Sequence, residues 1–151
     1  MKETPDDKSL EDRLGASKFS GEGFLGTDHR PVDEIVAADL HALAQLGVSK
    51  EALLAALRDV FEKARAALGG EVEIRPGVTA VAHESMGRIP SPFRGDGVFE
   101  KGDVVLSSAS GEQLVLTALG LAMIEKHSFF QGRGSRYRVD PARAATLLGL
   151  A

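Results

Sequence analysis

The chain contains no cysteine among its 151 residues. Disulfide bridges, thiolate metal sites and thiol nucleophiles are therefore excluded, because each of them needs a cysteine sulfur. No apolar run reaches the ~18 residues that a transmembrane helix needs, and residues 1–8 lack the apolar stretch of a secretory signal. These absences predict a soluble, cytoplasmic protein that makes no membrane contact.

Several signatures of nucleotide binding and catalysis are also missing. The sequence has no P-loop, no Rossmann glycine pattern and no Gly-x-Ser-x-Gly turn for a nucleophilic serine. Its histidines never show the His-x-x-x-His spacing of a zinc site on a helix. We therefore expect no cofactor and favour a binding protein over an enzyme.

The composition that remains is that of one ordinary globular domain. Hydrophobic residues make up 43% of the chain and charged residues 26%, and the length suffices for one hydrophobic core. Residues 1–18 are polar and charged, which predicts a flexible N-terminal arm. We expect residues 19–151 to form a single domain.

The first half of this domain shows helical periodicity. Apolar residues recur at helical spacing over about 31–46 and 50–68, and the short turn between them predicts a helical hairpin. Asp28 or Thr27 is expected to cap the first helix, and Ser49 the second. The apolar stripe of the second helix is predicted to face the core and comprises Leu53, Leu54, Leu57, Val60, Phe61, Ala64 and Leu68.

The periodicity then changes to two. Strands are expected at 71–75 and 78–83, and again at 104–107 and 114–117, each pair joined by a turn. Residues 85–103 are rich in proline and glycine and predict a long loop, which is often functional.

The C-terminal part combines two more helices with a short strand. Thr117 is expected to cap a helix over about 118–126, a strand is expected over 135–139, and Asp140 is expected to cap the last helix. Helices and strands are thus segregated along the chain. We predict an α+β fold, in which an N-terminal helical hairpin packs on a mostly antiparallel sheet of about four to five strands, with two further C-terminal helices.

Charge is distributed unevenly in this acidic protein, whose net charge is −4. Residues 1–40 hold ten acidic and five basic side chains, whereas residues 126–143 hold five basic side chains and one acidic side chain. A basic segment within an acidic protein predicts an anionic partner for one face of the molecule.

The segment 132–138 (Gly-Arg-Gly-Ser-Arg-Tyr-Arg) is the strongest candidate binding motif. Its glycines would let backbone N–H groups turn towards an anion, and its arginines supply guanidinium groups that suit phosphate or carboxylate. The alternative is an exposed strand whose arginines pair with acids elsewhere. The candidate ligand-binding residues are Lys126, His127, Arg133, Gly134, Ser135, Arg136 and Arg138.

Three functions fit these observations. The favoured one is a small binding or regulatory domain that holds an anionic small molecule or a protein partner at the basic loop. The second is a nucleic-acid-binding accessory protein that uses the same loop, because basic and aromatic side chains together suit single strands. The helices expected at 50–68 and 118–126 are too apolar to read bases in a groove, so this function is not favoured.

The third and least favoured function is a small metal-dependent or acid–base enzyme that uses His83, Glu84 and His127. Adjacent residues of a strand point to opposite faces, so His83 and Glu84 would not converge within one. The sequence names no substrate, and it leaves open whether the protein is a homo-oligomer.

Overall fold

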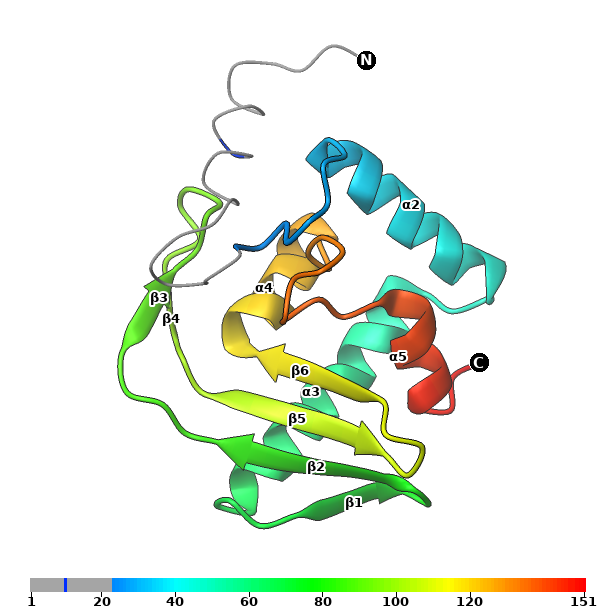
Figure 1. Cartoon of the computed structure of the whole chain (residues 1–151), viewed down its shortest axis with the longest axis vertical. Coiled ribbons are helices and arrows are strands. Elements are labelled where there is room, and N and C mark those ends of the chain that lie inside the picture. Colours follow the sequence, from blue (N-terminus) through cyan, green and yellow to red (C-terminus); the bar gives the residue numbers. More distant parts are fainter. Residues whose placement is uncertain (1–9, 11–22) are drawn as a thin grey trace.

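A computed structural model gives the fold of residue 10 and residues 23–151 (Figure 1). In this part of the chain the helices are α2 (Val32–Gln45), α3 (Lys50–Ala66), α4 (Ala118–His127) and α5 (Pro141–Leu147). The strands are β1 (Val72–Arg75), β2 (Val78–His83), β3 (Arg88–Pro90), β4 (Val98–Glu100), β5 (Asp103–Ser108) and β6 (Gln113–Thr117). This order confirms the predicted α+β fold. No helix within residues 23–151 is long and apolar enough to cross a membrane.

The strands pair only in antiparallel fashion. One sheet has the order β1-β2-β5-β6, and β3 and β4 form a separate two-stranded sheet. The prediction of one continuous loop over 85–103 is therefore wrong on either side of residues 91–97, where Ile89 of β3 lies opposite Phe99 of β4. Both side chains pack against a hydrophobic cluster, and this tertiary contact is not encoded in the local proline and glycine pattern.

Side-chain caps begin three of the four helices in the described part of the chain. The Ser49 side chain accepts a hydrogen bond from the Ala52 N–H (3.0 Å), and Thr117 and Asp140 cap α4 and α5 in the same way, as predicted. The cap predicted for α2 is wrong. This helix begins after Pro31 without a side-chain cap, because Asp28 is used elsewhere.

The larger hydrophobic cluster lies between α3 and the four-stranded sheet. Figure 1 shows α3 across one face of this sheet, and no helix of the described part covers the other face. The buried side chains of α3 are Leu53, Leu57, Val60 and Ala64, and those of the sheet are Val78, Ala80, Val104, Leu106, Leu114 and Leu116. Most of the predicted apolar stripe of α3 is thus confirmed.

Leu68 departs from this stripe. The helix ends at Ala66, so helical spacing no longer applies two residues later. Leu68 adopts a left-handed conformation with φ 50°, and 87% of its surface is exposed. The prediction that it faces the core is wrong.

A second hydrophobic cluster joins α2, α4 and the β3–β4 ribbon. Its buried members are Phe24, Ile35, Phe93, Leu119, Met123 and Phe129. Leu10 also packs against this cluster. The rest of the predicted flexible arm at residues 1–18 lies outside the described residues.

Candidate functional site

The basic segment 132–138 folds as successive turns. The Ser135 N–H donates to the Gly132 carbonyl, and the Arg138 N–H donates to the Ser135 carbonyl, each over 3.1 Å. The strand predicted over 135–139 is therefore wrong. Its backbone groups bond partly within the segment and partly to segment 24–28.

Segment 24–28 packs directly against these turns. The Gly132 N–H donates to the Phe24 carbonyl (2.8 Å), and the Thr27 N–H donates to the Arg133 carbonyl (2.9 Å). The Arg133 N–H in turn donates to the Asp28 carboxylate (3.1 Å). Two segments that are about a hundred residues apart in sequence are thereby joined by their backbones.

The glycines of the motif make this close approach sterically feasible. A side chain at Gly132 would collide with the Leu25 carbonyl, and one at Gly26 would collide with the Ser135 nitrogen. The N–H groups of Gly132, Arg133 and Ser135 all have acceptors within the protein. What the segment offers an anion is therefore mainly its guanidinium groups.

Asp28 accepts the hydrogen bonds that connect segment 24–28 to Arg133 and to Arg30. Its carboxylate receives two hydrogen bonds from the Arg30 guanidinium (2.9 and 2.6 Å) in addition to the bond from the Arg133 N–H. The Arg30 hydrogen bond, aided by the backbone donors, holds the pKa of the Asp28 carboxyl well below its usual range, although burial opposes this shift. Asp28 is therefore ionised wherever the protein is folded at ordinary pH.

Arg138 is the most extensively hydrogen-bonded arginine of the segment 132–138. Its guanidinium donates to both carboxylate oxygens of Asp39 on α2 (2.9 and 2.8 Å), to the Gln131 carbonyl (2.6 Å) and to Asp140 (3.2 Å). The side chains of Arg138 and Asp39 are only 12% and 6% exposed. Burial lowers the pKa of Arg138, but the hydrogen bonds and charges of Asp39 and Asp140 outweigh it and the pKa is raised. Arg138 joins α2 to the turns, and its charge is already balanced.

Arg133 and Arg136 are in a different situation. Both are exposed, and neither forms an ion pair with any residue that the structure describes. The Arg136 guanidinium lies 5.3 Å from the centre of the Tyr137 ring. Arg143 is also exposed, and its nearest acidic oxygen, on Glu112, is 3.8 Å away.

These arginines surround one hollow of about 500 Å³, which we call the arginine hollow. It is lined by Ala38, Asp39, Ala42, Gln113, Leu114, Arg133, Gly134, Ser135, Arg136, Arg138, Asp140 and Arg143. Four arginines thus face two carboxylates, and both carboxylates contact Arg138. The lining carries an excess of positive charge in a protein that is acidic overall.

The hollow collects five of the seven residues predicted from the sequence, but Lys126 and His127 do not line it. The His127 ring Nε2 is instead hydrogen-bonded to the Asp96 carboxylate (2.6 Å), which accepts, and the ring stacks on Phe93 at 3.7 Å between centroids. These contacts join the end of α4 to the turn between β3 and β4. The position of His127 is therefore explained by its contacts within the fold, without a role in ligand binding.

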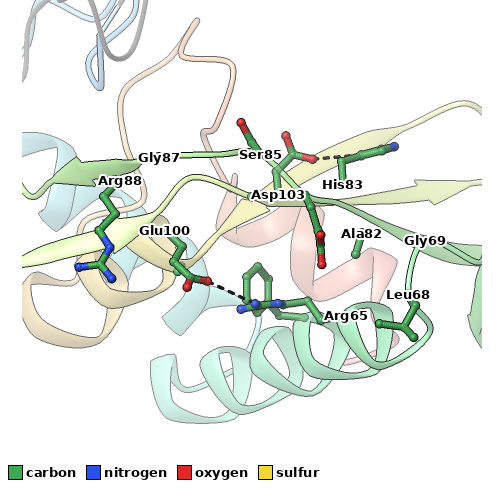
Figure 2. A pocket seen from close by; sticks show the side chains of 14 residues that line it. Arg65, Leu68, Gly69, Ala82, His83, Ser85, Gly87, Arg88, Glu100 and Asp103 are labelled. Carbon is green, nitrogen blue, oxygen red and sulfur yellow. Dashed lines mark hydrogen bonds and ion pairs between the residues drawn. The ribbon is translucent and has the colours of Figure 1, made fainter.

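A larger cleft, of about 710 Å³, lies between the C-terminal half of α3 and the adjoining strands (Figure 2). We call it the ribbon cleft; it is lined by Phe61, Arg65, Leu68, Gly69, Ala82, His83, Glu84, Ser85, Gly87, Arg88, Glu100, Gly102, Asp103 and Ala118. Sequence reasoning missed it, because its residues come from separate elements and share no local motif.

The ribbon cleft contains two of the three residues of the enzyme hypothesis. His83 is hydrogen-bonded to Asp103 (3.1 Å), and Figure 2 shows its ring directed away from Ser85. His127 does not line this cleft. Within the described part of the chain, no three His, Asp or Glu side chains are grouped as metal ligands.

Comparison of the chain with protein-family models, with curated proteins and with solved structures finds no match.

Proposed function

We propose that this protein is a small binding domain that holds an anionic group in the arginine hollow. The observation that carries the proposal is the unequal balance of charge in the lining. Arg133 and Arg136 have no acidic partner among the described residues, while the only lining carboxylates, Asp39 and Asp140, contact Arg138. An anion from outside would supply the missing negative charge.

The arginines divide into two roles in this proposal. Arg138 is largely buried and its charge is balanced by Asp39 and Asp140, so it positions the turns and does not bind the ligand. Arg133 and Arg136 keep their guanidinium donors exposed, and such forks suit the oxygens of phosphate or carboxylate. Arg143 adds a third positive charge at the rim, because its contact with Glu112 is long and exposed.

The ligand is a small molecule or a protein partner that carries a phosphate or carboxylate group. A volume of about 500 Å³ is within the range of pockets that hold small molecules. Single-stranded nucleic acid remains a second hypothesis, which Tyr137 next to Arg136 favours through stacking. Binding of that kind would weaken steeply as the salt concentration rises.

Thermal melting with inorganic phosphate as the probe tests the proposal. Phosphate is added at constant ionic strength, with chloride as the reference anion. At a phosphate concentration one hundred times Kd, binding to the folded state adds about 2.7 kcal/mol of stability, which for a chain of this size raises Tm by roughly 5–10 °C. The variant Arg133→Ala/Arg136→Ala should lose the phosphate-specific part of this shift.

A matched control separates a site from a general effect of charge. Arg94→Ala/Lys126→Ala removes the same amount of positive charge from exposed positions outside the hollow, and it should keep the full shift. Phosphate also stabilises proteins by exclusion from their surface, and that part is common to all three proteins. Equal shifts in the parent and in both variants would contradict the proposal.

A further inference from the structure

Strand pairing between residues 78–90 and 98–108 is interrupted beside the ribbon cleft. His83 pairs with Asp103 at the end of β2, and Arg88 pairs with Glu100 at the start of β3. Residues 84–87 on one side are therefore opposite only residues 101–102 on the other. Of these residues, Glu84, Ser85, Gly87 and Gly102 line the cleft.

Apolar side chains are exposed at the rim of this cleft. Leu68 lines it and is 87% exposed, and Met86, which lies between the lining residues Ser85 and Gly87, is 96% exposed. Val98 is 57% exposed and lies on the same face of the ribbon as Arg88 and Glu100, since alternate residues of a strand share a face. The exposed Met86 thus lies next to the ribbon cleft, whose lining includes Phe61 and Leu68.

The charges of the cleft are of both signs. Arg65 contacts Glu100 (3.3 Å), and Figure 2 shows Arg88 beside this pair. Arg88 and Glu84 form no ion pair with the residues that the structure describes. One surface therefore carries a positive group, a negative group, an apolar projection and an apolar recess.

We infer that the ribbon cleft and residues 84–87 between β2 and β3 form a two-fold interface with a second copy of this chain. In a two-fold dimer the same patch of both copies forms the interface. If one residue of the first copy contacts a second residue of the other copy, the reverse contact also forms, so the patch must complement itself. Met86 of each copy enters the other copy's cleft, and Arg88 of each copy faces Glu84 of the other. A partner of one charge would not need both signs within one patch. This interface is independent of the arginine hollow.

Sedimentation equilibrium over a range of protein concentrations tests this inference. The parent protein should sediment as a monomer–dimer equilibrium. Arg88→Glu and Glu84→Arg each place like charges across the interface, so each should weaken dimerisation at least tenfold. The double variant Arg88→Glu/Glu84→Arg restores opposite charges and should recover most of the parent's dimer affinity. Met86→Asp should abolish the dimer, while Arg94→Glu should leave it unchanged.

Circular dichroism of each variant establishes that it is folded, and the recovery in the double variant does not depend on that control. A parent that remains monomeric at every concentration would overturn the inference, and the face would then be open to a different partner. A dimer that none of these substitutions weakens would overturn it as well, because its interface would lie elsewhere. Failure of the double variant to recover would contradict the proposed Arg88–Glu84 pairing.

Discussion

The arginine hollow and the ribbon cleft differ in how their charges are balanced. In the hollow, the buried Asp39 and the partly exposed Asp140 are both already bound to Arg138, so the positive charge of Arg133 and Arg136 remains uncompensated. In the cleft the charges are exposed and of both signs. Arginine side chains therefore have different binding properties in the two regions. An arginine's partners, rather than its presence in a basic segment, decide what it can bind.

Removal of Arg138 should have the largest effect on stability. Arg138→Ala leaves the carboxylate of Asp39 buried without a partner, and breaking a buried ion pair in this way costs about 3–5 kcal/mol. Arg133→Ala should change the free energy of unfolding by less than about 0.5 kcal/mol, because its side chain is exposed and unpaired among the described residues. Urea denaturation of both variants makes this comparison. Equal losses would contradict the division of roles between the arginines.

A side chain at Gly132 should have the next largest effect. Gly132→Ala places a Cβ against the Leu25 carbonyl and separates segment 24–28 from the turns, at a cost of about 1–3 kcal/mol. Gly95 has a positive φ of 90° but open space around it, so alanine there meets no collision and should cost less. A Gly132→Ala variant as stable as the parent in urea would show that the two segments are not held together as described.

The loss of folding stability at acidic pH should depend in part on Asp28. This effect should be smaller than those of Arg138→Ala and Gly132→Ala. Its folded pKa lies below the unfolded value, so its contribution to stability is complete above the unfolded pKa and is lost as pH falls. In the parent, this loss begins below about pH 5 and approaches 1.4 kcal/mol per pH unit. Asp28→Asn should be less stable near neutral pH and should lack this part of the slope. Urea midpoints measured between neutral and acidic pH provide the test, and parallel pH profiles would contradict it.

Local signals explain which parts of the fold could be predicted from the sequence. Ser49, Thr117 and Asp140 cap helices through bonds to residues three positions away, so the sequence contains all the necessary information. Apolar spacing likewise identifies the buried face of α3, but it fails at Leu68, because the helix ends before that residue.

Long-range contacts explain the errors. Arg138 forms an ion pair with Asp39, which is 99 residues away in sequence. Turns that accommodate this contact replace the predicted strand over 135–139. Asp28 binds Arg30 and the Arg133 N–H and therefore does not cap α2. The basic motif did identify five residues of the hollow, because its members are adjacent in sequence. No local signal connects Arg65, Glu84 and Arg88 in the ribbon cleft.

The most direct test of the central claim is a phosphate titration followed by NMR of the arginine side-chain Nε–Hε groups. If the arginine hollow binds phosphate, the signals of Arg133 and Arg136 should shift with a common saturating dependence on phosphate concentration. The Arg138 signal should change little, because its donors are already bound to Asp39, Asp140 and the Gln131 carbonyl. Arg65 and Arg88 in the ribbon cleft should also be unaffected. Small, non-saturating shifts spread over all exposed arginines would contradict the account, because they would show that the hollow has no specific affinity for an anion.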